Sequence, residues 1–355
     1  MMTSIGELRR RTLETLTRQS YSIASKDIVL LNDNANLFGV NPAVFEVADR
    51  FDFSRLWAYP SENSDALRER IALEHKVSPE EVIVGNGSDE LLDITSKCFL
   101  NPGDMFCSPA PTFGMYKFYA RLNLADISEK VLNKDFSLDP QPLLDERAKI
   151  YSICEPNNPT ANLFERESVR RLLNEAFGVV LVDEAYADFS GSNYLPDVMD
   201  SEHALDLRTF SKAYGLAGLR AGYAVSRKEL IDELRRVRTP FGLNSFTEAV
   251  AIAAMDDKKW IYETIAQMKS ERAWLGPRLE KLGFKVYPSE CNFLLCKSPV
   301  DGPALVSALR SEGVATRDCN SYPLLENHMR ITIAPRQMLE KLLSKLEHLI
   351  AGGKG

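Results

Sequence analysis

The run Thr209-Phe210-Ser211-Lys212-Ala213-Tyr214-Gly215-Leu216-Ala217-Gly218-Leu219-Arg220 carries more chemical information than any other part of this 355-residue chain. It places one amine, two hydroxyl groups and a guanidinium within a few residues, on a backbone made pliable by Gly215 and Gly218. A lysine in this setting suits a Schiff base with an aldehyde cofactor, and the hydroxyls and Arg220 suit that cofactor's phosphate. A solvated surface lysine is the alternative, and the mostly apolar approach from Leu205 to Phe210 disfavours it.

Around this run, from about residue 65 to residue 238, short apolar runs alternate with amphipathic helical segments. Such alternation predicts an α/β fold with a mostly parallel central sheet wrapped by helices. The run Gly178 to Asp183 lacks polar alternation, as expected of a strand with both faces covered. We expect strands at 81–84, 104–108, 149–154, 178–183, 205–209 and 221–225, and helices at 88–99, 112–121 and 165–176.

The pattern changes after about Asn244. A long helical stretch, 246–282, with a break expected near Asp256-Asp257, precedes short strands and a last amphipathic helix. This predicts a large domain at 37–244 and a smaller α+β domain at 245–355. The N-terminal arm, 1–36, is expected to pack with the smaller domain or with a partner subunit. The short strands are expected at 285–287, 292–296 and 328–333.

Composition excludes several classes of function. The net charge is −7 and Lys and Arg are spread along the chain, which indicates neither nucleic-acid binding nor a polybasic membrane anchor. No signal peptide or membrane span is evident, so we expect a cytoplasmic protein. The six cysteines form no C-x-x-C pair and favour reduced thiols, and the four scattered histidines indicate no metal site.

Asp183 ends the buried strand, where ligand sites form in parallel sheets. Its burial requires a cationic or hydrogen-bonding partner, and a pyridinium nitrogen, held protonated so that the ring is an electron sink, is such a partner. A helix N-cap carboxylate is the alternative. Tyr186, three positions on, is placed to hydrogen-bond a ring hydroxyl, with a packed tyrosine as the alternative.

Three loops that follow strands carry further candidates. Gly87, Ser88 and Asp89 open a helix, whose N-terminus favours a phosphate, although Ser88 as a plain N-cap is compatible with this. Asn158 is presented between two prolines to a phenolate oxygen, or belongs to an ordinary Asn-Pro turn. Phe113 is a candidate to stack on a flat ring, with core packing as the alternative.

Two arginines lie in the predicted smaller domain. Arg330 sits in an apolar strand and requires an anion, either a substrate carboxylate held bidentately or a structural salt-bridge partner. Arg317 is next to Asp318, which indicates a surface ion pair of little value as the alternative to a substrate contact.

Together these residues resemble the fold-type I aminotransferases that use pyridoxal 5′-phosphate, and within them the histidinol-phosphate aminotransferase family. The resemblance covers nearly the whole chain, and it implies the fold of that class. One matching motif is weak evidence, whereas the ordered set is specific. The set comprises Tyr59-Pro60, Gly87-Ser88-Asp89-Glu90, Asn157-Asn158-Pro159-Thr160, Asp183-Glu184-Ala185-Tyr186, Thr209-Phe210-Ser211-Lys212 with Arg220, and Arg330-Ile331-Thr332-Ile333.

The resemblance implies roles for the cofactor residues. Lys212 forms the Schiff base, Asp183 pairs with the pyridine nitrogen, and Asn158 and Tyr186 contact the 3′-oxygen of the ring. Phe113 takes the ring-stacking place. The residues implied around the phosphate are Gly87, Ser88, Asp89, Thr209, Ser211 and Arg220.

The resemblance also implies the substrate contacts and the assembly. Arg330 matches the arginine for the substrate α-carboxylate or the analogous group, and Arg317 matches one linked to the substrate phosphate or carboxylate. Tyr21 and Asn36 are expected at the substrate entrance. Tyr59 matches a tyrosine that relatives contribute across the subunit interface to the cofactor site, so a homodimer with shared sites is implied.

The implied reaction moves the amino group of L-histidinol phosphate to 2-oxoglutarate, in histidine biosynthesis. An L-threonine O-3-phosphate decarboxylase, an aromatic amino-acid aminotransferase and a cofactor-binding protein without catalysis are the alternatives. The chain departs from the family at Ala161, where relatives usually have glycine, and at 32–39, which lacks the usual Glu-Asn-Pro. Because that segment borders the substrate, the identity of the amino donor depends on it most.

Overall fold

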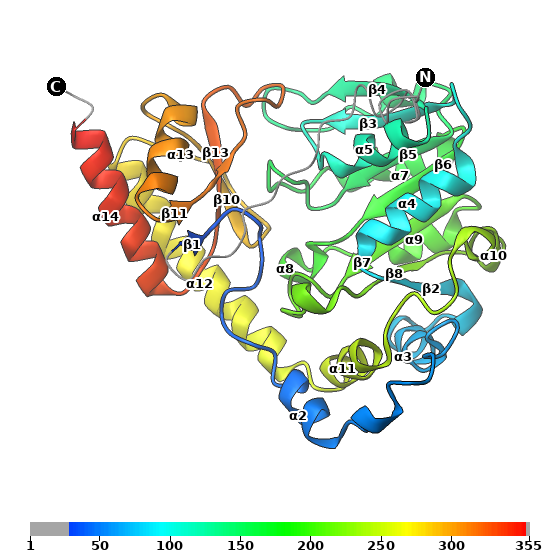
Figure 1. Cartoon of the computed structure of the whole chain (residues 1–355). Helices are drawn as coiled ribbons and strands as arrows, with labels where there is room; N and C mark the ends of the chain where they lie inside the picture. Colours follow the sequence, from blue (N-terminus) through cyan, green and yellow to red (C-terminus); the bar gives the residue numbers. More distant parts are fainter. Residues whose placement is uncertain (1–27, 353–355) are drawn as a thin grey trace, which may run out of the picture.

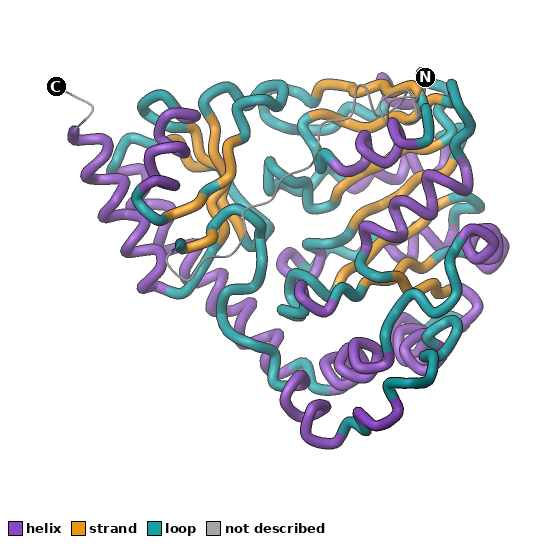
Figure 2. The backbone as a smooth tube through the Cα atoms, viewed as in Figure 1, coloured by secondary structure: helices purple, strands orange, loops and turns teal. Residues whose placement is uncertain are grey.

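The computed structural model describes residues 28–352 of the chain (Figure 1). Figure 2 shows the strands gathered into two separate groups with helices around each. The larger group is a seven-stranded sheet in the order β2-β8-β7-β6-β5-β3-β4, and the smaller group contains a four-stranded sheet. The predicted α/β fold, with a mostly parallel central sheet and a smaller α+β part, is therefore confirmed.

The large sheet is parallel from β7 through β6, β5 and β3 to β4, and β8 alone runs in the opposite direction. The carboxyl ends of the parallel strands therefore meet along one edge of the sheet. Its strands are β2 (Val82–Gly85), β3 (Met105–Ala110), β4 (Asp126–Val131), β5 (Ile150–Cys154), β6 (Val179–Asp183), β7 (Ala204–Thr209) and β8 (Gly222–Val225).

Helices cover both faces of this sheet, which explains why its central strands lack polar alternation. Figure 1 shows α4 and α5 in front of the sheet and α7 and α9 behind it. Within β6, Leu181 belongs to the apolar cluster that includes α4, whereas Val180 and Val182 belong to the one that includes α7. These helices are α3 (Asp65–His75), α4 (Ser88–Phe99), α5 (Met115–Leu122), α6 (Gln141–Leu144), α7 (Arg166–Glu175), α8 (Ala187–Ser190), α9 (Leu195–Asp200) and α10 (Lys228–Val237).

The smaller group is an antiparallel sheet in the order β12-β13-β10-β9, packed against helices. The expected break in the long helical stretch is present, because α11 ends at Asp256 and α12 begins at Lys259. The elements are α2 (Ala43–Arg50), α11 (Ser245–Asp256), α12 (Lys259–Lys281), β9 (Lys285–Val286), β10 (Phe293–Lys297), α13 (Gly302–Ser311), β11 (Val314–Ala315), β12 (Arg317–Asp318), β13 (His328–Thr332) and α14 (Arg336–Gly352).

The described part of the N-terminal arm joins this smaller group. Strand β1 (Val29–Leu30) pairs in parallel with β11, and the Leu31 carbonyl accepts a hydrogen bond from the Thr332 N–H at 2.9 Å. The segment after β1 then leads to α2, which packs on α11. The chain between β1 and α2 therefore runs from the smaller sheet toward the helices beside the larger one. The domain boundaries at 36/37 and 244/245 stay a prediction.

Strand β4 and helix α5 of the large domain differ from expectation. Strand β4, which the sequence analysis did not predict, is a largely exposed edge strand with the polar sequence Asp-Ile-Ser-Glu-Lys-Val, so burial leaves little pattern in it. Helix α5 begins at Met115 rather than at residue 112, because β3 continues to Ala110 and Pro111 follows.

Other properties follow from the described residues. None of the described helices combines the length and the apolar composition needed to cross a membrane. All six cysteines are free thiols. Within residues 28–352, no cluster of His, Cys, Asp and Glu is suited to a metal ion.

Candidate active site

Two cavities with a shared wall lie at the carboxyl ends of the parallel strands. The inner cavity, of about 450 Å³, is enclosed by the ends of β5, β6 and β7 and the start of α4. The outer cavity, of about 500 Å³, extends from this shared wall to β12 and β13 of the smaller sheet. The inner cavity brings together these predicted cofactor residues: Ser88, Asp89, Phe113, Asn158, Asp183, Tyr186, Thr209, Ser211, Lys212 and Arg220.

Lys212 lies in the turn that follows β7. The Gly215 N–H closes this turn on the Lys212 carbonyl at 3.1 Å, and Gly215 has a φ of 68°, which favours glycine. A Cβ on Gly215 would lie 2.7 Å from the Trp260 ring. The Lys212 Nζ donates to the Asp33 carbonyl oxygen at 3.0 Å. Burial, reinforced by the Arg330 guanidinium, lowers the pKa of Lys212 to about 8, so a neutral amine is available near physiological pH.

Asp183 is a buried carboxylate at the end of β6. Its Oδ2 accepts from the Tyr116 hydroxyl at 2.6 Å and its Oδ1 from the Ala185 N–H at 3.0 Å. Burial raises the pKa of Asp183 to about 6. Helix α8 begins after Tyr186 and has no side-chain cap, so the N-cap alternative for Asp183 is wrong. Among the described residues Asp183 has no cationic partner, which a protonated ring nitrogen would supply.

Tyr186 and Asn158 connect the inner cavity to the outer one. The Tyr186 hydroxyl accepts from Asn34 Nδ2 at 3.0 Å and from Asn158 Nδ2 at 3.5 Å. Asn158 Oδ1 accepts from Arg330 Nη1 at 2.6 Å. Burial raises the pKa of Tyr186 above its ordinary value, so the hydroxyl keeps its proton. The pair therefore offers a hydroxyl and an amide at the same place, as recognition of a phenolate oxygen requires.

The start of α4 and the Arg220 side chain form an anion-binding corner. Arg220 Nη2 pairs with Asp89 Oδ2 at 3.1 Å, and its Nη1 lies 3.4 Å from Ser211 Oγ. Gly87 has a φ of 82°, which favours glycine, and a Cβ there would displace the Arg220 guanidinium, which lies 2.5 Å from that position. The helix N-terminus, two hydroxyls and a guanidinium fit a phosphate.

Phe113 lines both cavities and contacts the Tyr116 ring edge-to-face, with the ring centroids 5.4 Å apart. Its ring is partly buried against the core, so Phe113 packs on the core and lines the cavities at the same time. Phe113 thus occupies a place from which it can cover a flat group above Asp183.

Arg317 and Arg330 are directly opposite each other on the paired strands β12 and β13, and both line the outer cavity. Arg330 is only 8% exposed, and its Nη2 donates to the Asn32 carbonyl at 2.5 Å. It forms no ion pair among the described residues, and its Nε has no hydrogen-bond partner there, so the structural salt bridge considered for Arg330 is wrong. Arg317 likewise has no ion pair with Asp318 in the described chain. Two adjacent guanidiniums without carboxylates are suited to an anionic ligand.

Two predicted residues, Tyr59 and Asn36, lie elsewhere. Tyr59 is 81% exposed, stacks on Phe241 with a centroid distance of 4.8 Å, and lines neither cavity. The expectation for Asn36 is wrong, because its Nδ2 donates to the Ala213 carbonyl at 3.2 Å and the residue lines neither cavity. Asn36 instead supports the turn that carries Lys212. Tyr21 lies outside the described residues.

Two side chains that hydrogen-bond to the predicted site residues were not predicted from the sequence. Tyr116 donates to Asp183, and Asn34 donates to Tyr186. For Tyr116 a signal existed, since it is an aromatic residue three positions after Phe113 in the helix predicted at 112–121. No comparable signal marked Asn34, which reaches the site across 152 residues of sequence.

The fold and this constellation of lysine, aspartate, phosphate corner and paired arginines define a transaminating enzyme of the aminotransferase type. A family model of class I and II aminotransferases matches residues 26–346, and the chain belongs to this family. Pyridoxal 5′-phosphate is its cofactor, and the geometry of the inner cavity fits that molecule.

More specific similarities are to proteins with histidinol phosphate in their names. The chain is 35% identical to histidinol-phosphate aminotransferase of Methanocella arvoryzae over 93% of this chain and 92% of that protein. Its fold is similar, with a TM-score of 0.88 and 23% identity, to histidinol-phosphate aminotransferase from Sinorhizobium meliloti in complex with pyridoxal-5′-phosphate, covering 97% and 98% of the two chains.

The same fold serves a different reaction elsewhere. L-threonine-O-3-phosphate decarboxylase from Porphyromonas gingivalis superimposes with a TM-score of 0.80 and 22% identity, covering 91% of this chain and all of that one. At this identity the likeness shows the fold alone, so the reaction must be argued from the site.

Proposed function

We propose that this protein transfers the amino group of L-histidinol phosphate to 2-oxoglutarate, giving imidazole acetol phosphate and L-glutamate. The observation that carries the proposal is the placement of Lys212, Asp183 and Arg330 around two cavities with a shared wall. Similarity to histidinol-phosphate aminotransferases over nearly the whole chain supports this donor.

The residues of the inner cavity would hold the cofactor. Lys212 supplies the amine for the aldehyde, Asp183 faces the ring nitrogen, and Phe113 covers the ring. Asn158 and Tyr186 offer their amide and hydroxyl to the ring oxygen. The phosphate corner consists of Gly87, Ser88, Asp89, Thr209, Ser211 and Arg220.

Pyridoxal 5′-phosphate, when bound, supplies an electron sink for the Cα–H bond of the amino donor. Lys212 would hold the cofactor aldehyde through its Nζ. When that amine is free and neutral, it would take up the Cα proton of the amino donor. Its lowered pKa fits this task, because a base works best with a pKa near the operating pH. Asp183 would supply a carboxylate to the ring nitrogen, and the hydrogen bond from the Tyr116 hydroxyl orients this carboxylate.

The outer cavity would hold the anionic part of each substrate. Arg317 and Arg330 bind the phosphate of the donor in one half-reaction and carboxylates of 2-oxoglutarate in the other. A phosphate anchor of this kind also fits L-threonine O-3-phosphate, which is why the decarboxylase is the main alternative reaction. An aromatic amino-acid aminotransferase would use Arg330 for the α-carboxylate.

We also propose a homodimer in which Tyr59 reaches the site of the partner subunit. Tyr59 belongs to an exposed apolar surface that includes Phe45, Phe53, Leu56 and Trp57, which are 53–86% exposed. Exposed apolar surface of this kind marks interaction sites. The free cysteines fit a reducing compartment, and we assign the protein to the cytoplasm.

A panel of half-reactions tests the function. The holoenzyme is mixed separately with L-histidinol phosphate, L-threonine O-3-phosphate, L-phenylalanine and L-glutamate, and the cofactor absorbance is followed. We expect the fastest conversion with L-histidinol phosphate and equal amounts of glutamate and keto product when 2-oxoglutarate is added. Release of CO₂ from threonine phosphate would establish the decarboxylase instead, and no change with any amine would indicate a binding protein.

A further inference from the structure

The segment Asn32-Asp33-Asn34 contacts three site residues in succession. The Asn32 carbonyl accepts from Arg330, the Asp33 carbonyl from Lys212, and the Asn34 amide donates to Tyr186. The segment is therefore part of the site wall and is held at fixed distances from the groups that act on the amino donor.

The segment is also fixed from behind. The Asn34 N–H donates to Thr332 Oγ1 at 3.0 Å, the Thr332 hydroxyl donates to Asn34 Oδ1 at 3.1 Å, and Asn292 Nδ2 donates to the Asn34 carbonyl at 3.0 Å. Asn34 has a φ of 56°, which turns the chain at this point. These bonds to β13 and to the residue before β10 hold the neighbouring Asp33 in one position.

Asp33 brings a carboxylate to the shared wall, because it lines both the inner and the outer cavity. Its Oδ1 accepts from Asn32 Nδ2 at 2.9 Å, and it forms no ion pair among the described residues. Asp89, the other acidic residue on the shared wall, differs in this respect, because it pairs with Arg220. Asp33 therefore retains acceptor capacity for a ligand.

The position of Asp33 divides the outer cavity by charge. Its carbonyl accepts from the Lys212 amine at 3.0 Å. Burial and Arg330 lower the pKa of Lys212, whereas the Asp33 carboxylate raises it, so this carboxylate also lies near the amine. Arg317 and Arg330 supply positive charge on the smaller sheet. A donor with an anion on one arm and an N–H group on the other would be oriented by these opposite charges, whereas a second carboxylate near Asp33 would be repelled.

Resting on the proposed function, we infer that the Asp33 carboxylate accepts a hydrogen bond from the imidazole N–H of the amino donor and selects donors with a nitrogen heterocycle. Asp33 is thus a specificity-determining residue, and Arg317 and Arg330 hold the phosphate of the same molecule.

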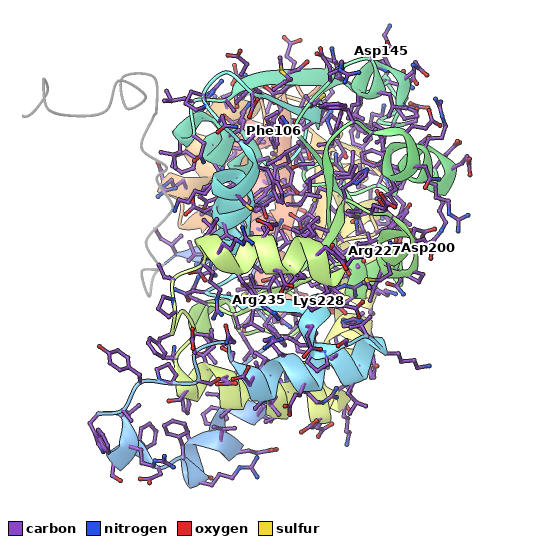
Figure 3. All side chains as sticks on the ribbon, turned by 90° about the vertical axis from the view of Figure 1, so that its right-hand side faces the viewer. Phe106, Asp145, Asp200, Arg227, Lys228 and Arg235 are labelled. Carbon is purple, nitrogen blue, oxygen red and sulfur yellow. The ribbon has the colours of Figure 1, made fainter. Side chains whose placement is uncertain are left out.

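Two unreactive phosphates that lack the amine test this inference: 3-(imidazol-4-yl)propyl phosphate and 3-phenylpropyl phosphate. They share the phosphate and chain, and only the first has a ring N–H. Their dissociation constants are measured with the holoenzyme by titration calorimetry, for the unaltered protein, Asp33→Asn and Asp33→Ala. Asp145→Asn is the control, because Figure 3 shows Asp145 at the outer rim of the molecule, where it accepts a bond from Gln141.

We expect the unaltered protein and Asp145→Asn to prefer the imidazole compound by about tenfold or more, the size of a hydrogen bond to a charged acceptor. In Asp33→Asn and Asp33→Ala the preference should fall to about twofold or less, with affinity for the phenyl compound unchanged or increased. An unaltered preference in both variants, or no preference in the parent protein, would overturn the inference. Glutamate formation from L-histidinol phosphate, measured in parallel, separates this result from a failure of the proposed function.

Discussion

The two walls of the site differ in how they are built. The inner wall consists of loops that follow strands of the large sheet, and it carries Lys212, Asp183 and Arg220. The outer wall is assembled from the arm around Asp33 and from the paired strands β12 and β13 of the smaller sheet. The inner wall faces a group that is the same in every turnover, whereas the outer wall faces two different substrates. Short sequence motifs therefore suffice to encode the inner wall, whereas the outer wall depends on contacts between residues far apart in the sequence.

The largest effect is expected from the inner wall. Replacing Lys212 with alanine removes both the covalent anchor and the proton carrier, so kcat should fall by about 10³-fold or more. Glutamate formation gives the rate, and borohydride reduction followed by peptide mass mapping locates the cofactor. Lys97→Ala, which removes a surface lysine paired with Asp93, is the control. Transamination that survives in Lys212→Ala would refute the assignment of this lysine.

A substitution on the outer wall should change mainly the KM of the amino donor. Arg330→Gln removes a charge that has no carboxylate partner among the described residues, and we expect KM for the phosphorylated donor to rise by about 10- to 100-fold. The fall in kcat should be smaller, because Arg330 does not contact the reacting bond. The exposed Arg278, which lies over Trp274, provides Arg278→Gln as control. A loss confined to kcat would contradict the division of labour between the walls.

A pH measurement tests whether a charge on the outer wall changes the pKa of a residue on the inner wall. Neutral Lys212 captures the cofactor, and its pKa is lowered to about 8, so uptake of pyridoxal 5′-phosphate by the apoprotein should increase with pH through a midpoint of about 8. Arg330 contributes to this lowering, so Arg330→Gln should move the midpoint to higher pH. The rate is followed by absorbance. A midpoint near the ordinary lysine value of 10.5, or one insensitive to Arg330, would show that the walls are electrostatically independent.

The smallest effect on kcat is expected from removing the hydrogen bond that Tyr116 donates to Asp183. Tyr116→Phe removes the hydroxyl that lowers the pKa of this carboxyl, so the pKa of Asp183 should rise. We expect kcat to decrease about 2- to 10-fold, because Tyr116 orients the carboxylate and does not touch the substrate, with the larger decrease at acidic pH. Tyr262→Phe on the exposed surface is the control. An unchanged pH profile would indicate that Tyr116 only fills space.

The residues of the inner wall could be predicted from the sequence because they follow strands with a clear apolar pattern. Asp183 ends a fully buried run, and Ser88 opens a helix whose predicted bounds match α4. It failed where burial leaves no pattern, as in the exposed edge strand β4. It also failed at Asn34 and Asn36, because the partners of an amide are decided by tertiary contacts rather than by local spacing.

The hydrogen bonds between Asn34 and Thr332 have a consequence for synthesis of the protein. They join residues 298 positions apart, and β13 is the last strand of the chain that the structure describes. A nascent chain therefore carries the lysine and the phosphate corner long before the arm has its final support. The ribosome must release β13 before a donor meets a finished binding surface, so activity cannot precede the synthesis of that strand.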